Sequence, residues 1–88
     1  MSEELKNRSK QFALRILKVV DSLPNSVSGR AIANQLVRSG TSIGANYREA
    51  CRGRSKKEFI AKLGVVVEEA DESANWLELI IDGNLLGL

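Results

Sequence analysis

A chain of 88 residues with 43% apolar, 27% charged and 5% aromatic residues has the composition of a single globular domain, spanning 1–88. It contains no histidine, which excludes histidine general bases, Ser-His and Cys-His nucleophile pairs and most zinc sites. We therefore expect no enzymatic activity, no catalytic residue, no metal and no cofactor. The single cysteine, Cys51, has no internal disulfide partner, so we interpret it as a small buried side chain in a reducing, cytoplasmic compartment.

Charge is divided unevenly along the sequence. Residues 1–62 contain all 13 Lys and Arg and five acids, for a net charge of +8. Residues 63–88 contain six acids and no base, for a net charge of −6. The two regions either neutralise each other within the fold or face different partners. The apolar stretches are too short for a membrane span, so we expect no membrane partner.

The first helix is predicted over residues 3–23. Its apolar or small residues recur at steps of three and four, a helical spacing, at Leu5, Ser9, Phe12, Ile16, Val19 and Leu23. Ser2 is expected to cap this helix, and Pro24 to end it, because proline disfavours the helical conformation of the residue before it.

The second helix is predicted over residues 28–52, with Ser26 or Ser28 as its cap and Gly53 at its end. Its stripe consists of Ile32, Leu36, Ser39, Ile43, Asn46 and Ala50. Gly40 and Gly44 interrupt it at a cost of about 1 kcal/mol each relative to alanine. Either the helix breaks near Gly40, or the two glycines form a flat strip where another helix comes unusually close. The uninterrupted apolar phase favours the close approach.

The third helix is predicted over residues 55–82, because Ser55 and Glu58 have the spacing of a capping box. The residues from Asp82 to Asn84, with Gly83 between them, are expected to end it. Its apolar face is predicted to comprise Phe59, Leu63, Val67, Ala70, Ala74, Leu77 and Ile81.

These elements predict an all-α fold, an antiparallel up-and-down helical bundle with three long helices joined by short loops. Three broad apolar faces leave one side of such a bundle open. We therefore expect a fourth helix that is missing, truncated or supplied by a neighbouring subunit, and hence a homo-oligomer.

The segment from Gln35 to Ala50, QLVRSGTSIGANYREA, resembles the four-helix-bundle family named after the 23S rRNA intervening-sequence proteins. The KEFI segment, residues 57–60, matches the family's third-helix start, and the similarity covers essentially residues 10–82. The accessory proteins of diversity-generating retroelements resemble this chain more loosely. The resemblance implies a four-helix bundle that assembles into rings of five and binds RNA or DNA without catalysis. Two departures are Ala50, where the family usually has glycine, and the family's fourth helix, which would begin near Leu86.

Five bases lie close together where the second helix ends and the third begins: Arg48, Arg52, Arg54, Lys56 and Lys57. Lys56 and Lys57 lie at the positive end of a helix dipole, which is a poor placement for stability alone. Contact with a phosphate backbone would explain it. The alternatives are a solvated corner, or ion pairs with the acidic third helix of a neighbouring subunit.

Other polar and aromatic residues are expected to have structural roles. Asn46 and Glu49 lie three residues apart on one helix face, where Asn46 would fix register and Glu49 would pair with an arginine. Tyr47 and Trp76 are expected to be core or interface anchors and not base-stacking platforms. The acids at residues 68–72 lack the histidine that a bundle di-metal site requires.

Two classes of function therefore remain open. The first is an oligomer that binds RNA or DNA through the basic hairpin tip. The second is a structural or adaptor protein that acts only through contacts with partner proteins.

Overall fold

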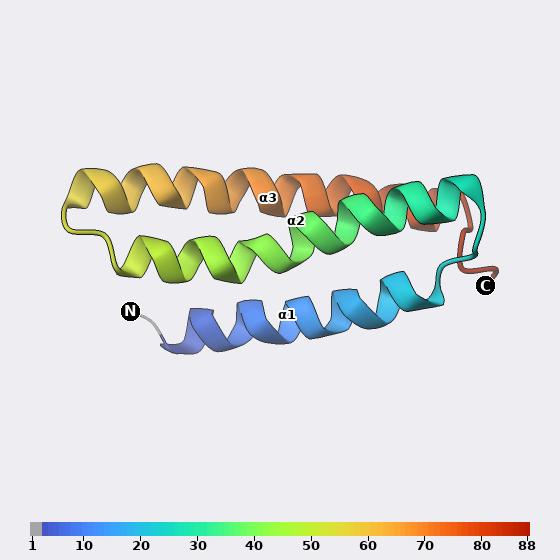
Figure 1. Cartoon of the computed structure of the whole chain (residues 1–88), viewed down its shortest axis with the longest axis horizontal. Helices are drawn as coiled ribbons and strands as arrows, with labels where there is room; N and C mark the ends of the chain where they lie inside the picture. Colours follow the sequence, from blue (N-terminus) through green and yellow to red (C-terminus); the bar gives the residue numbers. More distant parts are fainter. Residues whose placement is uncertain (1–2) are drawn as a thin grey trace.

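The computed structural model describes residues 3–88 as three helices in the order α1 (Glu3–Ser22), α2 (Val27–Cys51) and α3 (Lys56–Asp82). The chain reverses direction at both short loops, which places α2 between α1 and α3 (Figure 1). The result is an elongated all-α molecule with extents of 45 × 19 × 17 Å and no strand in the described residues. Each described helix end lies within one residue of its predicted position.

The helix ends follow from local hydrogen bonds. Ser26 is the N-cap of α2, and its Oγ accepts a hydrogen bond of 3.0 Å from the Gly29 N–H. The third helix ends at Asp82, and Gly83 N–H donates to the Leu79 carbonyl at 2.9 Å. Asn84 then adopts a positive φ of 50°, which turns the chain back toward α1. The predicted cap at Ser2 lies outside the described residues.

The two glycines of α2 mark a close approach of helices, as the unbroken apolar phase predicts. The helix is continuous through both. A Cβ on Gly40 would lie 2.9 Å from Ile16 Cγ1, and a Cβ on Gly44 would lie 2.9 Å from Ser9 Oγ. Helix α1 therefore packs directly on the backbone of α2 at these two positions.

The core forms where all three helices contribute side chains. Ile16, Leu36 and Ile80 are at its centre, and the side chains packed around them come from every helix and from the C-terminal turn: Phe12, Val19, Val20, Leu23, Ile32, Trp76, Leu77 and Leu85. Tyr47 is also buried, at 6% exposure. The positions of Tyr47 and Trp76 confirm that both aromatic residues are packing anchors.

The predicted apolar face of α3 is only partly the face that packs against α2. The buried residues of this helix are Ser73 and Ile80, and the hydroxyl of Ser73 lies 2.9 Å from that of Ser39. Val67 and Ile81, both on the predicted stripe, are 59% and 74% exposed. The face that packs against α2 is therefore displaced by about one residue from the predicted stripe.

The displaced stripe borders an open groove between α1 and α3. In the described residues no Cα of α1 lies within 8 Å of a Cα of α3, so the two helices meet only through side chains across α2. The lining of the groove is almost entirely apolar and consists of Phe12, Ile43, Ala70, Ser73, Ala74 and Leu77.

Candidate nucleic-acid interface

The candidate site is the hairpin tip that joins α2 to α3 (Figure 1). Arg52 is the C-cap of α2, and Gly53 N–H donates to the Ala50 carbonyl at 3.0 Å. A Cβ on Gly53 would lie 3.1 Å from that same carbonyl oxygen, so glycine permits the tight end of the helix. The chain then needs only Arg54 and Ser55 to enter α3.

The start of α3 is held by two hydrogen bonds that involve Glu58. Ser55 is the N-cap, and its Oγ accepts a bond of 3.1 Å from the Glu58 N–H. Glu58 Oε1 accepts from the N–H of Arg54 at 2.9 Å, whereas an ideal capping box would use the N–H of Ser55. The predicted cap is thus present with its reciprocal bond shifted by one residue, and this bond ties the basic loop to α3.

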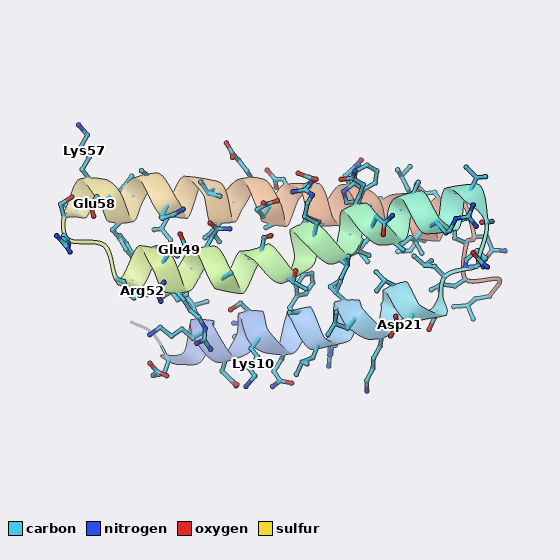
Figure 2. The ribbon with its side chains drawn as sticks, viewed as in Figure 1. Lys10, Asp21, Glu49, Arg52, Lys57 and Glu58 are labelled. Atoms are coloured by element: carbon cyan, nitrogen blue, oxygen red, sulfur yellow. The ribbon has the colours of Figure 1, made fainter. Side chains whose placement is uncertain are left out.

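All five predicted bases of the tip are exposed: Arg48, Arg52, Arg54, Lys56 and Lys57. They do not converge on one point. Lys57 extends from the start of α3 away from the bundle, whereas Arg52 lies at the end of α2 on the side of α1 (Figure 2). The bases therefore cover the end of the molecule and do not line a closed pocket.

Glu49 pairs with a lysine and not with the predicted arginine. Its Oε1 lies 2.9 Å from Lys62 Nζ of α3. The hydrogen bond from Lys62 and the positive charge of Lys62 lower the pKa of Glu49, and the charge of Arg52 lowers it further. The sequence did not point to Lys62 because it lies 13 residues from Glu49, and only the hairpin brings the two together.

Asn46 links the same two helices. Its Nδ2 donates to the Ser42 carbonyl at 2.9 Å, and its Oδ1 accepts from Lys62 Nζ at 3.5 Å. The expected register role is consistent with this contact between α2 and α3. Asn46 and Glu49 therefore hold the hairpin together just below the tip.

A second charged contact that the sequence did not indicate joins α2 to α3 further from the tip. Arg38 forms ion pairs with Glu72 and, at 3.9 Å, with Glu69. Two of the acids in the cluster at residues 68–72 therefore have a structural partner within the chain. The residues are 31 and 34 positions from Arg38, so no helical spacing could have predicted the pair.

No chemistry-bearing constellation accompanies the tip. Among residues 3–88 no group of three or more His, Cys, Asp and Glu side chains is placed to hold a metal ion. Cys51 is half-buried and not fully buried as predicted, because it borders a shallow hollow beside Lys56 and Phe59. None of the three described helices is long and apolar enough to cross a bilayer.

Comparison with known proteins gives a consistent family. The model for the 23S rRNA-intervening sequence protein family matches residues 2–87. The crystal structure of a protein of unknown function from Bacteroides thetaiotaomicron, described as a member of the S23 ribosomal protein family, shares 44% identity and a TM-score of 0.82. The match covers 89% of this chain and 72% of that chain. No curated protein matches the sequence.

Proposed function

The chain belongs to the 23S rRNA-intervening sequence protein family, and on this premise we propose that it is a non-enzymatic cytoplasmic protein that binds RNA or DNA weakly through its hairpin tip. The observation that carries the proposal is the exposure of five bases at one end of an elongated bundle: Arg48, Arg52, Arg54, Lys56 and Lys57. Such a surface contacts phosphates whatever the base sequence.

The position of Lys56 and Lys57 supports a phosphate ligand. Both lie in the first turn of α3, where the partial positive charge of the helix dipole opposes them. Arg48 and Arg52 lie at the end of α2, where the dipole favours a cation, so fold stability alone can account for these two. An anionic partner would offset the unfavourable placement of the lysines.

The acids near the tip are engaged in internal contacts. Glu49 is paired with Lys62, and Glu58 accepts the Arg54 N–H. In the part of the chain that the structure describes, no ion pair within 4.0 Å involves any of the five bases of the tip. Their charges therefore remain available to a ligand.

Assembly completes the proposal. The apolar groove between α1 and α3 suits a fourth helix, from the same or a neighbouring subunit, which would complete an antiparallel up-and-down bundle in a homo-oligomeric ring of five. The solved relative supports a fourth segment, because the match spans only 72% of its length. A ring would present several tips to one nucleic acid and raise a weak affinity by multivalency.

The test uses two variants with equal loss of charge. One replaces three bases at the tip, Arg54→Gln, Lys56→Gln and Lys57→Gln. The other replaces three exposed bases away from it, Arg15→Gln, Lys18→Gln and Arg30→Gln. Binding to single-stranded RNA and DNA is measured by gel shift at several salt concentrations. About four phosphate contacts predict a slope of log affinity against log salt of roughly −3 for the unmodified protein.

The tip variant is expected to flatten this slope by about 2, since each lost phosphate contact removes about 0.7 on single strands, and the control variant is expected to leave it unchanged. Absence of binding at about 50 mM salt, or equal losses in the two variants, would overturn the proposal. That outcome would favour the adaptor alternative, in which exposed apolar residues of α3 such as Ile60 and Val67 bind a partner protein.

A further inference from the structure

We infer that the nucleic-acid surface continues from the tip along α1 and α2 as a basic ladder made of two residues from each helix: Lys6, Lys10, Arg48 and Arg52. This inference rests on the proposed function. Its new content is that α1, a helix remote from the tip in sequence, supplies half of the phosphate contacts on this side. Figure 2 shows Lys10 and Arg52 toward the same end of the molecule, with Asp21 toward the other end of α1.

The register of α1 on α2 brings the two pairs together. The chain reverses between the helices, so the N-terminal half of α1 lies beside the C-terminal half of α2 (Figure 1). The close approach of Ser9 to Gly44 fixes this register, since a Cβ on Gly44 would lie 2.9 Å from the Ser9 hydroxyl. Lys6 and Lys10 flank Ser9 in the sequence, and Arg48 and Arg52 follow Gly44 by one and two turns.

Helix geometry places all four bases on one side of that contact. At about 100° per residue, Lys6 and Lys10 are rotated roughly 60° and 100° from Ser9 about the axis of α1. Arg48 and Arg52 are rotated roughly 40° and 80° from Gly44 in the same sense about the axis of α2. Because the two helices run in opposite directions, rotations of the same sense point to the same side.

The residues of the apolar groove confirm this assignment of sides. Phe12 is rotated roughly 60° from Ser9 in the opposite sense, and Ile43 roughly 100° from Gly44, also in the opposite sense. Both line the groove between α1 and α3. The basic ladder therefore lies on the side of the α1–α2 pair away from the groove, and it stays accessible when a fourth helix fills the groove.

The charges of the ladder are mostly unopposed. Lys10, Arg48 and Arg52 are exposed, and among residues 3–88 no carboxylate lies within 4.0 Å of them. Lys6 is 3.5 Å from Glu3, whose side chain is 92% exposed, so this pair is weak and can exchange for a phosphate.

The spacing of the ladder suits a nucleic-acid backbone. Residues four apart on a helix are separated by about 6 Å along its axis, close to two steps of about 3.4 Å along a nucleic-acid strand. Packed helices lie about 8–10 Å apart, so the two pairs form two rows. A protein partner would instead call for a centre rich in apolar and aromatic residues and poor in lysine. The nearby aromatic residue, Tyr47, is buried within the fold.

The test compares Lys6→Gln/Lys10→Gln with the charge-matched control Arg15→Gln/Lys18→Gln, in which both changes are on α1 but away from the ladder. Affinities for single-stranded RNA and DNA oligonucleotides are measured by fluorescence anisotropy. At about 0.15 M salt the ladder variant is expected to bind on the order of tenfold more weakly, with a salt slope flattened by about 1.4, because two phosphate contacts are lost. The control variant is expected to bind like the unmodified protein.

The outcomes separate this inference from the proposed function. If the unmodified protein binds neither nucleic acid, the proposed function fails. If it binds, and Arg54→Gln/Lys56→Gln/Lys57→Gln weakens binding while the ladder variant does not, the inference alone is overturned. A change in oligomer size for the ladder variant without a change in affinity per subunit would also overturn it, since the ladder would then contact a second copy of the chain.

Discussion

At the scale of single residues, the fold depends on a few small or paired side chains whose roles differ in how far the sequence reveals them. Gly40 and Gly44 were predictable as a close-contact strip, because two glycines four apart in an unbroken helical phase leave one face without Cβ atoms. Ser39 and Ser73 were not predictable as a pair. Their hydroxyls meet only because 34 residues of hairpin bring them together.

The glycine strip predicts opposite effects for two Gly→Ala substitutions. Gly40→Ala gains about 1 kcal/mol of helix propensity, but its Cβ would be 2.9 Å from buried Ile16, and such overpacking costs about 1–3 kcal/mol. We expect a lower melting temperature. Gly64→Ala in α3 meets nothing within 4 Å, so its melting temperature should rise by several degrees for a gain of about 1 kcal/mol. Equal stabilisation of both variants in thermal unfolding would contradict the close approach.

The pairing of Glu49 with Lys62 predicts how this carboxylate titrates. The hydrogen bond and charge of Lys62 lower its pKa in the folded protein. The stabilisation is therefore complete above the ordinary glutamate pKa and is lost as the pH falls through the lowered value. An NMR titration of the Glu49 carboxyl should show a midpoint below the ordinary range, and Lys62→Met should raise it. Lys57→Met, which removes an equal charge nearby, should leave it in place; equal shifts would argue against a specific pair.

At the scale of elements, the sequence predicted where the helices begin and end better than which face of α3 is buried. The caps Ser26 and Ser55 and the stops at Pro24 and Gly83 act through local bonds, which neighbouring residues determine. The buried face of α3 depends on a distant partner. It carries Ser73, which a search for apolar spacing passes over, whereas the more hydrophobic stripe one residue further along borders the groove.

The exposed stripe of α3 predicts where assembly occurs. Val67→Glu/Ala74→Glu places two charges along the groove, which a fourth helix should cover, so we expect the oligomer to dissociate while helicity by circular dichroism stays unchanged. Ala61→Glu/Asn75→Glu adds the same charge at exposed positions of α3 and should keep the oligomer. Light scattering at micromolar concentration measures both. A 9.6 kDa monomer for the unmodified protein would contradict the proposed assembly.

At the scale of the whole molecule, the division of charge along the sequence becomes a division in space. The hairpin places the basic end of α2 and the start of α3 beside the N-terminal half of α1, which carries Lys6 and Lys10 (Figure 2). The five bases of the tip could be identified from the sequence because they lie within ten residues. The contribution of α1 could not, since it depends on the register that Gly44 and Ser9 set.

The most direct measurement of the central claim, that the basic end of the molecule binds nucleic acid, is lysine reactivity with and without a single-stranded RNA. Each lysine is acetylated briefly in both states and quantified by mass spectrometry. Lys6, Lys10, Lys56 and Lys57 are expected to lose reactivity when RNA is bound, and Lys18, exposed on the second half of α1, is expected to keep it. Protection of Lys18 to the same degree as these four, or protection of none of them under conditions where RNA is bound, would contradict the account.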